Sequence, residues 1–220
     1  ARLGLEWMIS PQFKAIYNFS FDYSEQGAFP YGLYNPETKE TAAVSINDSS
    51  TYNRRMIGNQ LRLEYKSNQF TLSSTTGYRH LKDNMNMDQD FSPLSIFTLN
   101  QKQKQNAFSQ EIALKSNQPT NYQWSVGLYG FYDDLHTDGP VTFKEDGVKT
   151  VLQSVFDRLK ASIPRMPQLI ILDEQIYIPG SFDTPTYGLA LYHQSTINNL
   201  FTKGLSLTAG IRLDYEKAEM

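Results

Sequence analysis

The sequence contains no cysteine, and this absence excludes disulfide bonds, thiolate metal sites and cysteine nucleophiles together. It also contains no apolar run of about 18 residues or more, which excludes membrane-spanning helices. Neither sign of charge dominates: the formal net charge is −3, and so small a value gives no support to nucleic-acid binding. Glycine-rich phosphate loops and a recognisable nucleophile–base pair are missing as well.

What the sequence has instead is regular alternation of apolar and polar side chains. Between Asn106 and Asp134, two segments of this kind are joined by an Asn-Gln-Pro turn. Alternation with a period of two is typical of a β-strand with two different faces. The same pattern predicts strands at about residues 1–9, 13–23, 57–66, 70–81, 106–116, 122–133, 186–198 and 204–216. The predicted fold class is therefore all-β, an antiparallel up-and-down meander of about eight strands.

The longest interruption of this pattern, from Asp134 to about Asp183, contains a different period. Between Gly147 and Lys160, apolar residues recur three and four positions apart, which predicts one short amphipathic helix. We expect this helix to pack the loop against itself or against the rim of the sheet. Its polar face is too weakly basic to favour binding to a membrane surface.

Which strand face lies in water separates a soluble β-protein from a transmembrane β-barrel. The predicted connections are short after the first, third, fifth and seventh strands, and long after the second, fourth and sixth. Aromatic residues form two bands on the apolar face, with Trp7 and Phe13 near one set of strand ends and Tyr78 and Tyr132 near the other. Such loop asymmetry and aromatic girdles are typical of outer-membrane barrels. They favour a transmembrane β-barrel over a soluble one.

Charged residues occur in the middle of the predicted strands, on the polar face. In a transmembrane barrel they would face an aqueous lumen, whereas in a soluble protein they would lie on the solvated outer face, so their presence alone does not decide between the two. The predicted lumen-facing residues are Arg62, Glu64, Arg79, Glu111 and Arg212.

Four stretches then resemble a known family in a fixed order: TTGYRH at 75–80, SQEIALKS starting at Ser109, WSVGLYGFY starting at Trp124, and LALYHQST…GLSLTAGIRLDYE between 189 and 216. They are similar to barrel strands of TonB-dependent outer-membrane receptors. The resemblance implies a location in the outer membrane of a Gram-negative bacterium and active uptake of a scarce nutrient, such as an iron–siderophore complex. It also implies outer-membrane lipid as a partner, and a TonB-type energising complex acting through a plug domain. Because such transport makes and breaks no bond, the resemblance further implies that the protein is not an enzyme.

The chain departs from the family in ways that shape the expectation. No stretch matches a plug domain, about eight strands are too few for the whole family barrel, and the chain ends YEKAEM without a terminal aromatic residue. It opens ARLGLEWMIS, without an initiator Met or a signal peptide. We therefore expect an internal piece of a larger receptor. The alternatives are a soluble lipocalin-like ligand-binding barrel, and a small complete outer-membrane barrel with a structural or adhesion role.

Ligand contacts are predicted at two places in the long connections. Tyr31 and Tyr34 lie in the Gly/Pro-rich stretch GAFPYGLYN, where exposed rings would stack on a planar ligand or pack within the loop. The stretch DDLHTDG follows the sixth predicted strand with a set of carboxylates and one imidazole, which suits a ferric complex or only a polar strand exit. These residues are Asp133, Asp134, His136 and Asp138.

No resident metal or cofactor is predicted. The best candidate for calcium is DNMNMDQD, from Asp83 to Asp90, because hard cations prefer carboxylate and amide oxygens. This run lacks the glycine and the final glutamate of a calcium-binding loop, which favours an ordinary solvated loop.

Overall fold

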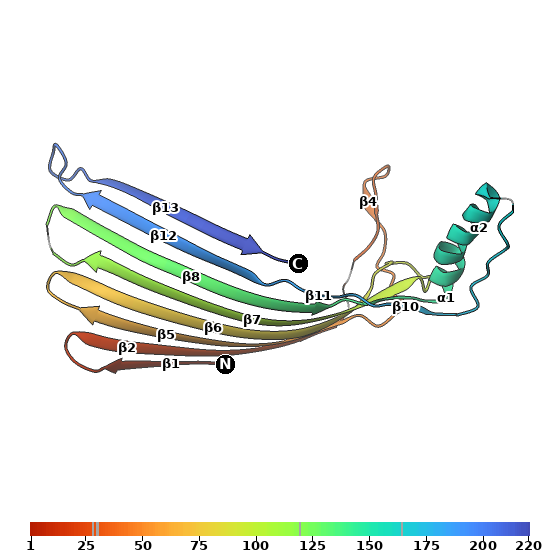
Figure 1. Cartoon of the computed structure of the whole chain (residues 1–220), viewed down its shortest axis with the longest axis horizontal. Helices are drawn as coiled ribbons and strands as arrows, with labels where there is room; N and C mark the ends of the chain where they lie inside the picture. The colour runs from red at the N-terminus through yellow and green to blue at the C-terminus, as the bar shows by residue number, and fades with distance from the viewer. Residues whose placement is uncertain (28, 30, 119, 164) are drawn as a thin grey trace.

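A computed structural model of the chain describes residues 1–27, 29, 31–118, 120–163 and 165–220. One large, curved antiparallel sheet dominates it (Figure 1). The eight strands of its main path follow each other across the sheet in chain order, so the all-β up-and-down meander expected from the sequence is confirmed. They are β1 (Arg2–Met8), β2 (Phe13–Gln26), β5 (Thr51–Lys66), β6 (Phe70–Asp88), β7 (Phe97–Ser116), β8 (Tyr122–Asp138), β12 (Thr186–Ile197) and β13 (Leu207–Ala218).

The two ends of the sheet carry different connections. Tight turns join β1 to β2 and β5 to β6, and serine side chains hold both: the Ser10 hydroxyl accepts a hydrogen bond from the Phe13 backbone N–H at 3.1 Å, and Ser67 accepts one from Phe70 at 3.0 Å. Serine stabilises such turns because its hydroxyl reaches the backbone two or three residues on. We call this the short-turn end, and the opposite one the long-connection end.

Four strands extend further toward the long-connection end than alternation predicts. β5 begins at residue 51 rather than about 57, β6 ends at 88 rather than 81, β7 begins at 97 rather than 106, and β8 ends at 138 rather than 133. Most of the loop expected at residues 82–104 is therefore strand, and Lys82 pairs directly with Lys104. The convex face is polar in these extensions, whereas the concave face keeps apolar side chains such as Met85, Met87 and Leu99. Backbone pairing therefore continues where the apolar pattern of the convex face has stopped.

Register separates the two faces of the sheet, because residues directly opposite each other in antiparallel strands share a face. The apolar face carries, for example, Ile112 and Leu128, which are directly paired and 47% and 51% exposed. The opposite face lines a cavity of about 670 Å³ with both polar and aromatic residues, among them Arg79, Asp133 and Phe131, so that face is concave and the apolar face is convex. One row across the apolar convex face consists of Leu63, Ser74, Ile112, Leu128, Leu191 and Leu213.

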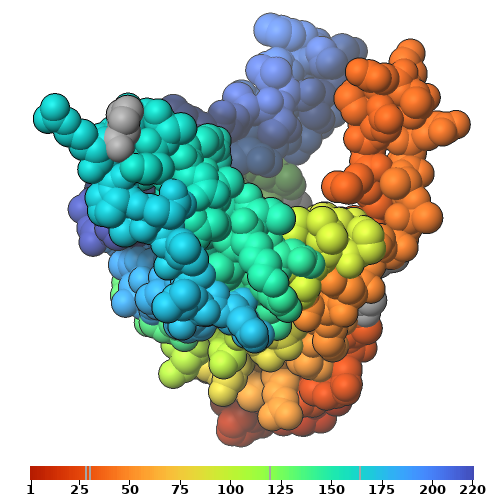
Figure 2. All heavy atoms as spheres, turned by 90° about the vertical axis from the view of Figure 1, so that its right-hand side faces the viewer, coloured from red at the N-terminus to blue at the C-terminus, as the bar shows by residue number. Residues whose placement is uncertain are grey.

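The long connections form their own substructures at the rim. A small hairpin of β3 (Tyr34–Asn35) and β4 (Glu40–Thr41) rises between β2 and β5. After β8 come β9 (Val141–Phe143), the helical segment, β10 (Ile176–Ile178) and β11 (Ser181–Asp183); β9 pairs with β7 and β10, and β11 pairs with β8. Seen from this end, the hairpin and the helix stand on opposite sides of the rim (Figure 2).

The helical segment is longer than the predicted 147–160. It comprises α1 (Glu145–Gly147), a π-helical turn η1 (Val148–Leu152) and α2 (Gln153–Ser162). Its start packs against the β6–β7 connection, where a Cβ on Gly147 would come within 2.1 Å of the Ile96 carbonyl oxygen. Further along, the Gln153 side chain bonds the backbone of Leu169 and Ile171. As expected, the loop thus packs against itself and the rim.

The outer strands of the sheet, β1 and β13, do not pair with each other within the residues described, so the sheet is open. Across those same residues, no helix has the length and apolar character needed to cross a membrane.

Candidate functional site

The residues predicted to face a lumen all lie on the concave face. Register shows this directly: Arg62 is opposite Thr75, and Thr75 is opposite Glu111, so these side chains share one side of the sheet. The same alternation places the others there, giving the concave set Arg62, Glu64, Arg79, Glu111 and Arg212. That this side encloses a lumen stays a prediction, because the sheet formed by the described residues is open.

A charged network crosses the concave face from β7 to β13. The Tyr192 hydroxyl donates to the Glu111 carboxylate at 2.9 Å, and the Arg212 guanidinium lies 6.0 Å from the Tyr192 ring centroid. Arg212 in turn pairs with Asp214 at 2.8 Å. Tyr192 reaches Glu111 by crossing the intervening strand at Gly127, where a Cβ would lie 2.2 Å from its ring. A side chain at 127 would therefore force the Tyr192 ring to move off the strand and away from Glu111.

A second polar chain lies nearer the long-connection end of the concave face. Arg79 donates to the Gln105 side-chain oxygen at 3.4 Å, and the Gln105 amide donates to Asp133 at 2.7 Å. Arg79 and Asp133 both line the concave cavity, together with the rings of Tyr129 and Phe131. Two residues predicted separately, one for the lumen and one for the ligand, are thus brought together by Gln105, which sequence reasoning did not single out.

The floor of this cavity is made of small residues. Gly58, Gly77 and Ser109 lie on it, and a Cβ on Gly77 would come within 2.7 Å of the Ser109 hydroxyl. Small side chains at the floor, with Arg79 and Asp133 beside them, leave an open polar trough rather than a filled core. Such a surface suits contact with a polar ligand or with another protein segment.

The DDLHTDG residues do not form one cluster. Asp133 faces the concave side, whereas Asp134, His136 and Asp138 alternate onto the convex side. There, His136 bridges two strands: its Nδ1 lies 2.6 Å from Asp183 of β11, and its Nε2 lies 3.4 Å from Asp138. The hydrogen bond to Asp183 raises the pKa of His136 above its ordinary value. Within the described part of the chain, no group of acidic and histidine side chains is arranged to hold a metal ion.

Tyr31 and Tyr34 occupy different environments at the rim. The Tyr31 ring makes an edge-to-face contact with Phe91 of the β6–β7 connection, with ring centroids 5.6 Å apart, and also stacks on Phe29. Tyr34 lies in the standing β3–β4 hairpin and is 61% exposed. Residues 28 and 30 of the same predicted loop lie outside the described residues.

The run from Asp83 to Asp90, considered above as a calcium site, is the end of a strand and has a structural role. Most of it belongs to β6, so its side chains alternate between faces instead of converging. Asp88 is only 1% exposed, and its carboxylate accepts hydrogen bonds from the backbone N–H groups of Asn47 and Asp48 at 2.9 and 3.2 Å. It therefore fastens the β2–β5 connection to the sheet. Nothing in the sequence pattern distinguishes Asp88 from its acidic neighbours.

Comparison with known proteins finds similarity at the level of structure. No family model matches the sequence, and no curated protein matches it. The siderophore receptor PiuA from Acinetobacter baumannii is similar in structure, with a TM-score of 0.54 and 10% identity, over 99% of this chain and 38% of that one. The ferric yersiniabactin uptake receptor FyuA from Yersinia pestis gives a TM-score of 0.47 at 8% identity, over 94% of this chain and 32% of that one.

The chain thus spans between 32% and 38% of the length of these solved structures. At such low identity the likeness concerns the fold alone. This chain has the strand arrangement of part of a siderophore receptor.

Proposed function

We propose that this chain forms part of the wall of a transmembrane receptor barrel in the outer membrane of a Gram-negative bacterium. In this proposal the receptor binds a scarce nutrient, an iron–siderophore complex, and imports it. Import is driven by a TonB-type energising complex, which acts through a plug domain outside this chain. The chain binds and transports, and performs no catalysis.

One observation carries the proposal: the apolar residues of the sheet lie on its exposed convex face. Leu61, Ile112 and Leu128 are 40%, 47% and 51% exposed, and soluble monomers rarely expose a contiguous apolar surface of this extent. From Tyr122 to Tyr132 the same face of β8 covers about 34 Å along the strand, or about 26 Å along a membrane normal at a 40° tilt. An outer-membrane barrel presents an apolar band of about that height.

The alternatives fit this arrangement less well. A soluble lipocalin-like barrel directs its apolar residues inward, whereas the concave side of this sheet carries Arg62, Glu111 and Arg212. A closed eight-stranded barrel requires β1 to pair with β13, and within the described residues these strands remain unpaired with one another.

The ligand class is proposed from weaker support. The fold likeness to a siderophore receptor favours an iron complex, and the polar concave cavity leads toward the end with long connections. Of the residues predicted to contact ligand, Asp133 lines that cavity, and Tyr31 and Tyr34 lie in the connection after β2. We assign ligand contact to these three. Asp134, His136 and Asp138 face the convex side and fit this role less well.

Fractionation of cells that express the protein from its own gene tests the membrane proposal. We expect the protein in the outer-membrane fraction, with release only by detergent. Recovery as a folded monomer in buffer without detergent, with Leu207, Ile211 and Leu213 protected from solvent, would overturn it. In the structure these three side chains are 53%, 64% and 63% exposed.

Uptake of radioactive iron by iron-starved cells tests the transport proposal. Deletion of the gene is expected to abolish uptake of at least one ferric siderophore. A protonophore is expected to do the same in the parent strain, because TonB-type transport draws on inner-membrane energy. Unchanged uptake of a broad panel of ferric siderophores after deletion would contradict the assignment to iron.

A further inference from the structure

A row of basic side chains crosses the convex face just beyond its apolar part. Arg55 of β5 is directly opposite Lys82 of β6, and Lys82 is directly opposite Lys104 of β7. All three side chains are exposed. We call Arg55, Lys82 and Lys104 the basic row.

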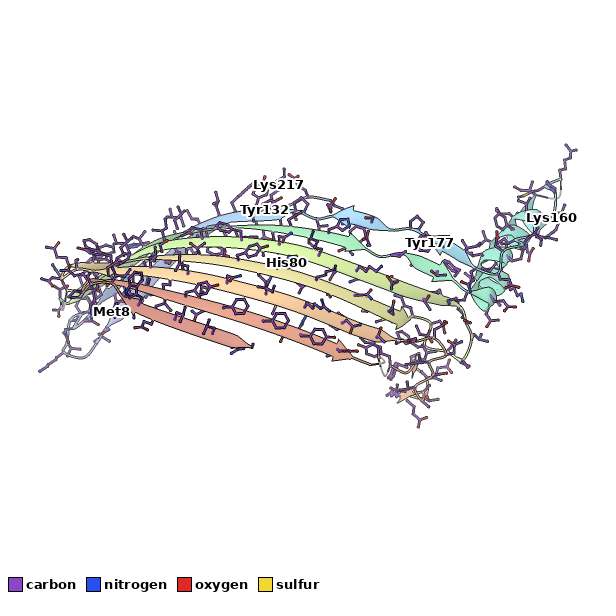
Figure 3. All side chains as sticks on the ribbon, turned by 90° about the horizontal axis from the view of Figure 1, so that it is seen from below. Met8, His80, Tyr132, Lys160, Tyr177 and Lys217 are labelled. Carbon is purple, nitrogen blue, oxygen red and sulfur yellow. The ribbon has the colours of Figure 1, made fainter. Side chains whose placement is uncertain are left out.

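Alternation fixes the face on which the basic row lies. Lys82 is two residues beyond His80 and four beyond Tyr78 on β6, so it shares their face; His80 is labelled in Figure 3. The next residue, Asp83, is buried and takes a hydrogen bond from the Tyr52 hydroxyl on the other side. The basic row therefore continues the convex, apolar face and not the concave one.

This arrangement is unfavourable by itself. Side chains directly opposite in an antiparallel pair have Cβ atoms about 5 Å apart, and like charges there destabilise the sheet. Within the described residues, neither Lys82 nor Lys104 makes an ion pair or a hydrogen bond through its side chain. Arg55 lies over the ring of Tyr23, with its guanidinium carbon 5.7 Å from the ring centroid, and makes no ion pair among the described residues.

The neighbouring cation on the concave face has an ion-pair partner. Arg54, the neighbour of Arg55 in sequence, points to the concave side and pairs with Asp22 at 2.9 Å. On the convex face, acidic groups flank the two ends of the row: Glu25 accepts the Tyr23 hydroxyl at one end, and Asp134, Asp138 and Asp183 surround His136 at the other. The centre of the row is thus a cationic surface without an internal anion.

The position of the row identifies its partner. The step from Tyr78 to Lys82 is about 14 Å along the strand, or about 10 Å along a membrane normal at a 45° tilt. Tyr78, Phe108 and Tyr132 are directly opposite one another and form the aromatic row that ends the apolar band. Tyr132 is labelled in Figure 3. Side chains placed just beyond an aromatic girdle lie at the depth of lipid headgroups, and lysine reaches them with its flexible stem.

We propose that the basic row binds the phosphate groups of lipid headgroups in the leaflet at the long-connection end. The inference rests on the proposed membrane location of the convex face. A headgroup anion fits better than a free one, because the row is continuous with an apolar surface that would receive the acyl chains. Neutralising the opposed cations would also remove the repulsion between them.

The test compares two double variants of the protein. Each variant is expressed from the protein's own gene carrying the two substitutions, and is purified in detergent. K82Q with K104Q removes two charges from the basic row. K66Q with K115Q removes two charges from exposed lysines on the concave face near the short-turn end, and serves as the matched control. The probe is lipid A carrying two phosphates, with its dephosphorylated form and inorganic phosphate as the comparison ligands, and binding is measured by native mass spectrometry.

The row variant is expected to bind bisphosphorylated lipid A about 30-fold more weakly, because each basic side chain near an anionic lipid surface contributes about fivefold. The control variant should bind like the parent protein. Without lipid, the row variant should unfold at the same or a higher denaturant concentration than the parent, since a repulsion has been removed. A misfolded variant would instead be less stable.

Equal lipid binding by the row variant and the control would overturn the inference, and so would equal binding of the dephosphorylated lipid. Competition by inorganic phosphate at millimolar concentration would show a free-anion site and would also overturn it. These failures differ from failure of the proposed function, which appears in fractionation as a protein that needs no membrane or detergent.

Discussion

The two ends of the sheet differ in their surface chemistry and in what holds them together, although the same strands run through both. Toward the short turns, one face is apolar and the other polar, and side chains such as Leu128 are exposed on the convex side. Toward the long connections the convex face is polar, and the buried side chains of the strands there are polar as well, such as Asp88 and Asp83, while Val148 of η1 is buried at the rim. The first region is suited to contact with lipid, whereas the second is held by hydrogen bonds between connections and strands.

Strands β5 to β8 thus stay paired beyond the end of the apolar band on the convex face. Lys82–Lys104 and Arg55–Lys82 are paired positions with no hydrophobic contribution. Cooperative hydrogen bonding along four long neighbouring strands compensates for this, because each extension has a partner on both sides or is covered by the rim.

The largest expected effect would break the contrast between the two ends. L128R places a charge on the convex face in the apolar band, and should lower the free energy of unfolding in lipid vesicles by about 2–4 kcal/mol. N53R, on the convex face in the polar region, should change it by less than about 0.5 kcal/mol. Chemical denaturation of the protein in vesicles measures both. Similar costs for the two variants would mean that the convex face does not meet lipid.

Asp88 is expected to hold the β2–β5 connection at the polar end of the sheet. D88A removes the buried acceptor of two backbone N–H groups. It should lower the free energy of local opening of the β2–β5 connection by about 1–3 kcal/mol. Hydrogen exchange at the amides of Asn47 and Asp48 is the measurement. D134A, which removes a carboxylate from the convex face, is the control and should leave both amides protected. Unchanged protection in D88A would show that the connection is fastened elsewhere.

On the concave face at the short-turn side, Y192F removes the hydroxyl that donates to Glu111. We expect the free energy of unfolding to fall by about 1 kcal/mol, because a part-buried hydrogen bond to a carboxylate is lost while the ring stays over Gly127. A double-mutant cycle with E111Q isolates the pair. Additive effects of the two substitutions would show that the hydrogen bond contributes nothing in solution.

The smallest expected effect concerns the contact between β8 and β11. Because the pKa of His136 is raised in the folded protein by Asp183, its contribution to stability is full below the ordinary value near 6.5 and is lost as pH rises through the raised pKa. Exchange of the β11 amides should therefore speed up as pH rises through that range, beyond the intrinsic rate. D183N should remove this extra pH dependence. An unchanged profile in D183N would contradict the assignment.

Much of the short-turn region follows from the sequence, because one apolar face makes period-two alternation visible. The extensions of the strands do not follow from it: in QKQKQ at 101–105, successive residues face opposite sides, yet none of them is apolar. The role of Gln105 between Arg79 and Asp133 depends on three strands and has no local signal.

The separation of the DDLHTDG residues depends on where β8 ends. Asp133 and Asp134 are consecutive residues of β8, so they face opposite sides. Because the predicted strand stops at 133, the sequence provides no reason to place Asp134, His136 and Asp138 on the face opposite Asp133. The burial of Asp88 likewise depends on where the β2–β5 connection crosses the rim, which no sequence pattern specifies.

The ring of Tyr192 lying across Gly127 has an evolutionary consequence. In related chains, the residues equivalent to 127 and 192 should vary together: a side chain larger than hydrogen at the first position requires a smaller or differently directed one at the second. The coupling extends to position 111, whose carboxylate loses its donor once the tyrosine is replaced. These three positions on β7, β8 and β12 should therefore be inherited as a unit.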